Sequence, residues 1–242
     1  MLQSYSQKII ESGHFVEYYN YENPIYRGYA KRKRYGKRKS LSDNEDKEKS
    51  KFSLYRTRGN LRRLVNSNPE LKKFVTLTFR DSIESISYAN YEFMKFVQRL
   101  KYNYVDNKNF KYISTIEFQK RGVPHYHVIA DLPFIDAGDL YDAWGNGFVK
   151  INLTGNEDCD NVGAYVAKYL SKNCSDKRMF NQKKYFCSRN LKRPVVIKDD
   201  NLVYKYFCDY AGKLKELFKR ECFNEHIGNY DYFQFKKFDF AK

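Results

Sequence analysis

Residues 111–131, which read KYISTIEFQKRGVPHYHVIAD, decide the fold of this chain. Two β-rich runs lie on either side of a short segment with Gly122, a pattern that predicts an antiparallel hairpin. Successive side chains of a strand point to opposite faces, so His125 and His127 share one face. The hairpin would bring Glu117 of the first run beside both histidines. The stretch therefore predicts a cation site with three ligands, Glu117, His125 and His127.

A second motif, NVGAYVAKYLSK, occupies residues 161–172. Tyr165 and Tyr169 are four residues apart, so a helix would carry both phenols on one face, with Lys168 close by. Asp160 or Asn161 can serve as the N-cap of this helix, which we expect over 160–172. Two phenols, an amine and a bound cation suit phosphodiester chemistry.

The surrounding sequence predicts an α+β fold, in which an antiparallel sheet packs its helices on one face and carries the site on the other. Alternating β-branched and aromatic residues indicate strands, and apolar residues at helical intervals indicate helices. The expected strands are residues 73–79, 112–118, 125–132 and 148–153, and the expected helices are residues 52–65, 88–102, 136–144 and 160–172.

The two ends of the chain have a different character from this core. Residues 26–51 form a basic block followed by a mixed-charge block, which we interpret either as an arm that binds DNA phosphates or as a solvated arm. Near the other end, residues 195–207 suggest a strand and a turn, and residues 210–223 have a short helical period. We therefore expect a basic N-terminal extension (1–72), a catalytic core (73–175) and a C-terminal extension packed on the core (176–242). The candidate DNA-binding residues of the arm are Lys31, Arg32, Lys33, Arg34, Lys37, Arg38 and Lys39.

The composition favours a polyanionic partner. The chain of 242 residues has 45 Lys and Arg against 29 Asp and Glu, a formal net charge of +16. Aromatic residues make up 18% of it, and aromatic side chains among basic ones can stack unpaired bases. Single-stranded nucleic acid is therefore an expected partner. An AT-rich genome would also enrich Lys, Tyr and Phe, so composition alone leaves the function undecided.

Other features narrow the class of protein. Five cysteines without a CxxC pair indicate neither a disulfide framework nor a zinc ribbon. The first residues, MLQSYSQKIIESGHF, lack a basic segment followed by an apolar stretch, and no window is apolar enough to span a bilayer. We expect a soluble cytoplasmic protein. The sequence contains no GxxxxGK phosphate loop, so unwinding driven by ATP is not expected of it.

Three blocks of the sequence resemble the HUH endonucleases: FVTLTF at 74–79, GVPHYHV at 122–128 and YVAKYLSK at 165–172. The paired tyrosines with Lys168 between them are most similar to the rolling-circle replication initiators of the Microviridae, which are single-stranded DNA phages. The resemblance covers roughly residues 74–172. Tyr126 departs from the aliphatic residue usual between the two histidines, but it points to the opposite face.

This resemblance implies an HUH core with a ferredoxin-like or RRM-like fold, and a metal-dependent nickase that uses Mg²⁺ or Mn²⁺. Tyr165 would attack an origin in single-stranded DNA, form a 5′-phosphotyrosine and release a 3′-OH for synthesis. Tyr169 would then act in the joining step. A host helicase and a host polymerase are the implied partners.

Three other interpretations remain open from the sequence. A two-tyrosine transposase or a plasmid relaxase could use the same site. A sequence-specific DNA-binding protein could bind through the basic arm while the HUH-like site is inert. A structural zinc protein could recruit Cys159 beside His125 and His127. His14 and His226 have no comparable context, and we interpret them as surface or packing residues.

Overall fold

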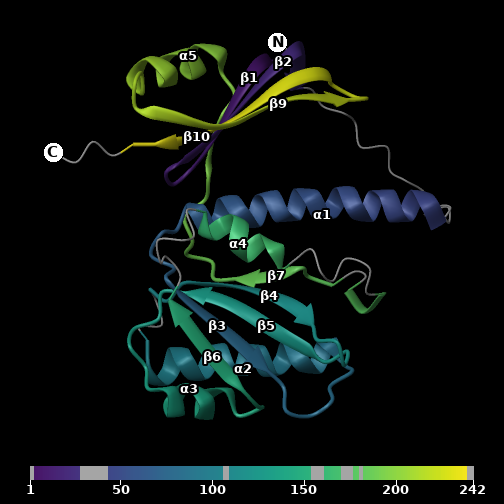
Figure 1. The fold of residues 1–242 in the computed structure, drawn as a ribbon, viewed down its shortest axis with the longest axis vertical. Coiled ribbons are helices and arrows are strands. Elements are labelled where there is room, and N and C mark those ends of the chain that lie inside the picture. Colours follow the sequence, from purple (N-terminus) through teal and green to yellow (C-terminus); the bar gives the residue numbers. More distant parts are fainter. Residues whose placement is uncertain are drawn as a thin grey trace. The chain divides into compact units, whose positions relative to one another are not determined.

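The fold is described from a computed structural model, in residues 3–27, 43–105, 109–153, 161–169, 177–179 and 182–238. The chain forms two compact units (Figure 1). We call residues 44–192 the central unit, and residues 1–43 with 193–242 the terminal unit. Each unit contains a five-stranded antiparallel sheet, so the α+β fold class is confirmed.

The sheet of the central unit has the strand order β6-β3-β5-β4-β7. It contains the four strands expected from the sequence, because each has alternating apolar residues that cover a core on one face. Its strands are β3 (Lys73–Thr78), β4 (Tyr112–Phe118), β5 (Pro124–Ala130), β6 (Val149–Leu153) and the short β7 (Tyr185–Cys187).

Two helices, α2 (Ile86–Asn103) and α3 (Ala137–Trp144), pack on one face of this sheet (Figure 1). Phe93 of α2 stacks on Tyr126 of β5, with ring centroids 4.6 Å apart. Trp144 of α3 is fully buried and contacts Phe79 and Phe96. This face therefore holds the larger hydrophobic core, and both helices occur where the sequence predicts them.

The opposite face of the same sheet is also covered by helices. Leu61 and Leu64 of α1 (Asp43–Asn66) share a second core cluster with Val166 of α4 (Val162–Lys168). That cluster includes Phe74 and Ile129 of the sheet. The expected packing of helices on one face thus describes α2 and α3, whereas α1 and α4 lie on the face that carries the candidate site. A 3-10 turn, η1 (Lys177–Met179), completes the described elements of the unit.

The terminal unit has the strand order β8-β1-β2-β10-β9. It pairs the first strands of the chain with the last ones, so the two predicted extensions share one sheet. Residues of α5 (Asp200–Asp209) cover one face of it. Its strands are β1 (Gln3–Ser12), β2 (Phe15–Arg27), β8 (Val195–Ile197), β9 (Leu214–Asn224) and β10 (Gly228–Lys237). The limits of the catalytic core, 73–175, stay a prediction.

Two local predictions in the terminal unit are wrong. The helical period of residues 210–223 gives way to β9, which pairs with β10 along almost its whole length. Residues 195–207 form a strand as expected, but α5 follows it in place of a turn, capped by the Asp199 carboxylate, which accepts from the backbone N–H of Asn201 and Leu202. Tertiary pairing outweighs weak local propensity in the first case. In the second, an N-cap starts the helix. No helix in the described part of the chain is long and apolar enough to cross a membrane.

Candidate metal and tyrosine site

The hairpin of β4 and β5 positions the three predicted ligands. Glu117 pairs directly with His125 across the two strands, and His127 lies two residues further along β5. The turn is closed by Gln119, whose backbone N–H donates to the Val123 carbonyl at 2.9 Å. Gly122 adopts a φ of 80°, which a residue with a side chain rarely does. The turn thus fixes the register that places all three ligands on one face.

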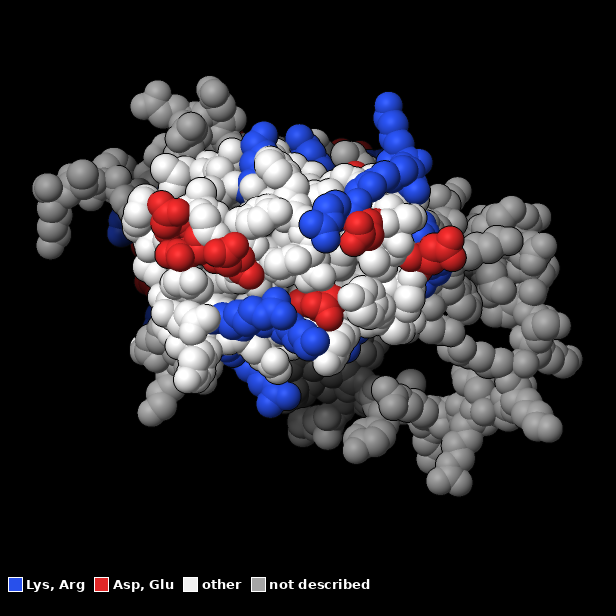
Figure 2. Space-filling model, turned by 90° about the horizontal axis from the view of Figure 1, so that it is seen from below, with Lys and Arg blue, Asp and Glu red and all other residues white. Residues whose placement is uncertain are grey.

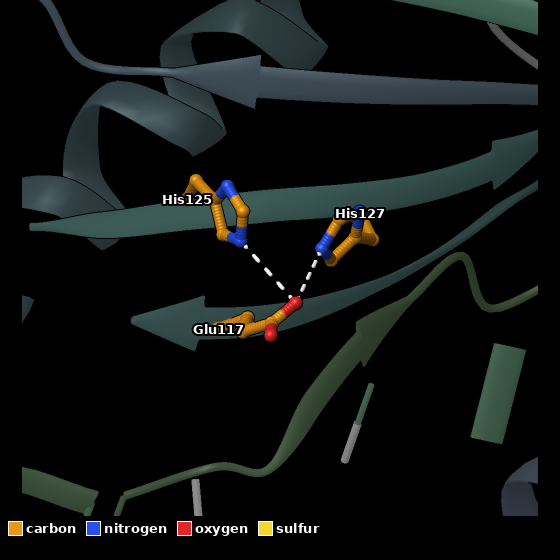
Figure 3. Close-up of side chains that lie close together, drawn as sticks. All are labelled: Glu117, His125 and His127. Atoms are coloured by element: carbon orange, nitrogen blue, oxygen red, sulfur yellow. Dashed lines mark hydrogen bonds and ion pairs between the residues drawn. The ribbon is translucent and has the colours of Figure 1, made fainter. Parts of the chain in front are cut away.

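The side chains of Glu117, His125 and His127 converge on one point (Figure 3). Glu117 Oε2 lies 2.8 Å from Nε2 of His127 and 3.3 Å from Nε2 of His125. The ligand atoms all lie within 4.8 Å of one another. Adjacent ligands of an octahedral cation, each about 2.1 Å from the metal, are about 3.0 Å apart. Two nitrogen donors and one oxygen donor at these distances fit a divalent cation of the Mg²⁺ or Mn²⁺ type, although they do not identify it.

The carboxylate and one of the imidazoles are buried. Glu117 is 7% exposed and His127 is 6% exposed, while His125 is intermediate. A carboxylate in such a place requires a compensating charge or hydrogen bond. The two imidazoles meet this requirement through protons, and a divalent cation between the three groups would meet it more strongly. The burial of Glu117 is therefore in keeping with a metal ligand.

A threonine of β3 orients the second histidine, which the sequence analysis did not foresee. Thr76 lies opposite His127 in the sheet, and its Oγ1 is 3.2 Å from Nδ1 of that ring. A hydrogen bond at Nδ1 fixes the tautomer and directs Nε2 toward Glu117. The ring of Phe74 stacks beside His127 at a centroid distance of 5.5 Å. The alternation of FVTLTF puts Thr76 on the site face, but nothing local in that sequence marks it as a partner of the histidine.

Both tyrosines of α4 face the triad, as the spacing of four predicts. The rings of Tyr169 and His127 are 3.8 Å apart between centroids, and Phe74 contacts both tyrosine rings. The Tyr169 hydroxyl donates to the Tyr165 oxygen at 2.9 Å. Tyr165 is 37% exposed, whereas Tyr169 is half-buried. The structure thus brings two hydroxyl groups from one helix to the face of the sheet that holds the triad.

The surroundings of Tyr169 hold its phenol in the protonated state. Burial raises the pKa of this hydroxyl above its ordinary value, and both the hydrogen bond to Tyr165 and the negative charge of Glu117 raise it further. A cation at the triad would offset the charge of Glu117. The reactivity of this phenol should therefore depend on metal binding.

Lys168 lies beside the first tyrosine. It is exposed, and its Nζ is 6.0 Å from the centroid of the Tyr165 ring. The amine therefore lies near the outer phenol, where it can meet a substrate phosphate from the solvent side.

Contacts with α1 fix the position of α4. Asn161 caps α4 through its side chain, which accepts from the backbone N–H of Ala164 at 2.9 Å. Asn66 of α1 accepts from the backbone N–H of Gly163 at 3.1 Å. A Cβ at Gly163 would lie only 2.3 Å from Asn66 Oδ1. Asn66 and Gly163 are positioning residues that the sequence analysis missed, and the small residue in the first turn of a short helix was the available signal.

The predicted DNA-binding residues Lys31, Arg32, Lys33, Arg34, Lys37, Arg38 and Lys39 lie outside the described residues. Figure 2 shows the molecule from below, the side on which Figure 1 draws α2 and α3. Lys and Arg residues alternate there with Asp and Glu residues and with uncharged surface, so the described residues in this view form no continuous basic band. The excess of positive charge is therefore not concentrated on that side.

Comparison with known proteins gives one match. A search of curated proteins and a search of solved structures each found none. Residues 72–174 match the family model of the replication-associated protein ORF2. The matched segment is less than half of the chain, but it contains the triad and both tyrosines. Over this segment the chain is similar to replication-associated proteins, a likeness that supports a role in initiating DNA replication.

Proposed function

We propose that this protein initiates rolling-circle replication by nicking and rejoining single-stranded DNA through a covalent tyrosine intermediate. The observation that supports this proposal is the convergence of the triad with the two phenols of α4. The ring of Tyr169 lies 3.8 Å from that of His127, and its hydroxyl is hydrogen-bonded to that of Tyr165. A phosphodiester that reached the triad would therefore meet a nucleophile on the same face.

The metal ligands in this proposal are Glu117, His125 and His127, which hold Mg²⁺ or Mn²⁺. When bound, such a cation supplies Lewis-acid stabilisation to the scissile phosphate. Three protein ligands leave positions in an octahedral shell for substrate oxygens and water. Thr76 keeps the His127 ring in the tautomer that presents Nε2.

The tyrosines carry the covalent step. The Tyr165 oxygen attacks phosphorus in line, loses its proton to solvent and forms the phosphotyrosine bond. The bond between phosphorus and the 3′ oxygen breaks, and that oxygen takes up a proton to become a 3′-OH. The energy of the phosphodiester is thus retained in the protein–DNA link, and no ATP is consumed. Lys168, next to Tyr165, is suited to neutralise charge on the phosphate.

The second tyrosine closes the cycle. After one round of synthesis, Tyr169 attacks the regenerated junction, and the 3′-OH released then attacks the first phosphotyrosine to seal the displaced strand. The proposed substrate is single-stranded, since a strand must be unpaired to bend across the site. A host helicase and a host polymerase supply unwinding and extension in the host cytoplasm.

The test is formation of a covalent adduct. The purified chain is incubated with labelled single-stranded oligonucleotides tiled across the replicon that encodes it, with Mn²⁺ or with EDTA, and analysed on denaturing gels. We expect an adduct that depends on the metal and is lost in the Tyr165→Phe/Tyr169→Phe double variant. Tyr102→Phe is the matched control, because that tyrosine is 91% exposed on α2 and should leave the adduct unchanged.

The other outcomes separate the alternatives. If no tiled oligonucleotide yields an adduct while binding is intact, the protein is a DNA-binding protein with an inert site. If cleavage maps to the ends of a mobile element, the transposase or relaxase interpretation replaces the initiator. If the central unit melts on removal of zinc, the site is structural.

A further inference from the structure

A row of alternating cationic and aromatic residues crosses the sheet of the terminal unit. Lys8 of β1 pairs with Tyr19 of β2, Tyr19 pairs with Tyr232 of β10, and Tyr232 pairs with Arg220 of β9. Residues that pair directly across neighbouring strands point to the same face. The row therefore places two phenols between two cations, over about 14 Å of sheet. We call these four residues the aromatic row.

The aromatic row lies on the face opposite α5. Ile9 and Val16 point toward α5 and share a core cluster with its Val203. Tyr18 likewise contacts Phe207 of α5, with ring centroids 4.9 Å apart. The neighbours of these residues along each strand, which include the members of the row, must therefore point the other way. The hydrophobic core of the unit does not account for the aromatic row.

Contacts within the face hold the rings in place. The rings of Tyr19 and Tyr232 are 5.1 Å apart, and Lys8 Nζ lies 3.7 Å from the centroid of Tyr19. Tyr230, which lies next along the same face, contacts Tyr19 at 6.3 Å and the buried Tyr21 at 5.7 Å. The rings of Tyr19, Tyr230 and Tyr232 are half-buried, so each is fixed from one side and retains exposed surface. Aromatic surface that is ordered in advance costs little entropy when a ligand stacks on it.

The charges of this face match a phosphate chain. Arg220 is exposed at one end of the row, and Lys8 lies at the other. Two more cations, Lys236 and its partner Lys215, pair further along the same strands. The acidic group on this face, Glu17, is 1% exposed and accepts a hydrogen bond from the Tyr19 hydroxyl. The accessible charge of the row is thus positive, with aromatic surface between the cations.

We propose that the aromatic row, together with Tyr230, is a binding surface for single-stranded DNA. Unpaired bases would stack on the phenol rings, and the phosphates between them would contact Lys8 and Arg220. Stacking of this kind tolerates any sequence, because every base has a π-face. Duplex DNA has its base faces already occupied, so it gains only the phosphate contacts. This surface is separate from the metal triad, and the proposal does not depend on cleavage.

The first experiment measures binding of the full chain to a fluorescent (dT)20 by anisotropy, in EDTA so that no cleavage occurs. We expect Tyr19→Leu/Tyr232→Leu to weaken binding at least about tenfold, with an unchanged dependence on salt. Arg220→Gln should reduce the slope of log affinity against log salt by about 0.7. The matched control is Tyr204→Leu on α5, an exposed tyrosine of the same unit that should bind normally.

The same series decides against the proposal in three ways. Normal affinity of a folded Tyr19→Leu/Tyr232→Leu variant would overturn it, as would equal loss of affinity for a 20-base-pair duplex. Tighter binding of (rU)20 than of (dT)20 would overturn the assignment to DNA. Formation of the covalent adduct should persist in these variants when DNA is saturating, which separates this proposal from the proposed nicking.

A measurement on the unmodified chain covers the case in which the variants fail to fold. An oligonucleotide with 5-iodouracil is bound and irradiated, and the crosslinked peptides are identified by mass spectrometry. Crosslinks at Tyr19, Tyr230 or Tyr232 are the expected result, because this base reacts with aromatic rings on which it stacks. Crosslinks confined to other parts of the chain would overturn the proposal.

Discussion

Replacing Gly163 by alanine should slow nicking through a displacement of the tyrosine helix. The new Cβ would lie 2.3 Å from Asn66 Oδ1 and 2.4 Å from the carbonyl oxygen of Arg62, whereas an ordinary contact is about 3.5 Å. Neither obstacle can easily yield, because one is backbone of α1 and the other caps α4 through the Gly163 N–H. Helix α4 must therefore retreat by about 1 Å, and Tyr165 and Tyr169 move with it.

The expected magnitude follows from that displacement. A shift of 1 Å in a reacting group can cost on the order of 10²-fold in rate, and overpacking costs about 1–3 kcal/mol of stability. The initial rate of adduct formation on single-stranded DNA measures the first effect, and thermal unfolding measures the second. Metal binding to the β4–β5 hairpin should be nearly unchanged, because Gly163 contacts α1 and not the triad.

A glycine within α1 provides the matched control. A Cβ at Gly59 would meet nothing closer than the flexible guanidinium of Arg63 at 3.7 Å. Gly59→Ala should nick at the normal rate and gain up to about 1 kcal/mol of stability from helix propensity. If Gly163→Ala proved too unstable to assay, Asn66→Ala would remove the cap without adding bulk and should show a smaller loss of rate. Normal nicking and normal melting of Gly163→Ala would refute the idea that this contact positions the tyrosines.

Three further variants test separate parts of the central unit. Thr76→Val keeps the shape of the side chain but removes the hydrogen bond to His127, so Mn²⁺ affinity measured by calorimetry should fall about 10–100-fold; an unchanged affinity would mean that Phe74 packing alone orients the ring. Glu117→Gln should abolish both Mn²⁺ binding and the adduct, and an adduct that survived would exclude the triad as the metal site. Burial raises the pKa of Glu70, but the hydrogen bond and charge of Lys111 outweigh it and leave that pKa below its ordinary value. Its contribution to stability is therefore present above the ordinary pKa and lost as the pH falls through the lowered one, so Glu70→Gln should destabilise the protein at neutral pH and make no difference in strong acid; an equal effect at both would contradict the ion pair.

The central unit could be predicted because its signals are local. The alternation around His125 and His127 fixes which side chains share a face, and the turn with Gly122 fixes the register that adds Glu117. The spacing of Tyr165 and Tyr169 is likewise a property of a single helical turn. These patterns require no knowledge of distant residues, and the structure places all five of these site side chains on one face of the sheet.

The terminal unit could not be predicted because its sheet joins distant parts of the chain. Tyr19 pairs with Tyr232, and no short window of sequence contains both. The strand β9 has apolar residues at intervals that also fit a helix, and only its pairing with β10 decides between the two. The contacts of Thr76 with His127 and of Asn66 with Gly163 were missed for the same reason, since each joins two elements.

The hydrogen bond between the two phenols bears on the order in which they act. Tyr169 donates this bond, and Tyr165 accepts it. A donor that points at an oxygen stabilises negative charge there, so the bond assists an attack by Tyr165 and opposes one by Tyr169. Burial and Glu117 also raise the pKa of Tyr169, which keeps its proton in place during the first step. Once Tyr165 is esterified, its oxygen is a poorer acceptor and the bond weakens. The same contact that favours Tyr165 as the first nucleophile would thus release Tyr169 for the second.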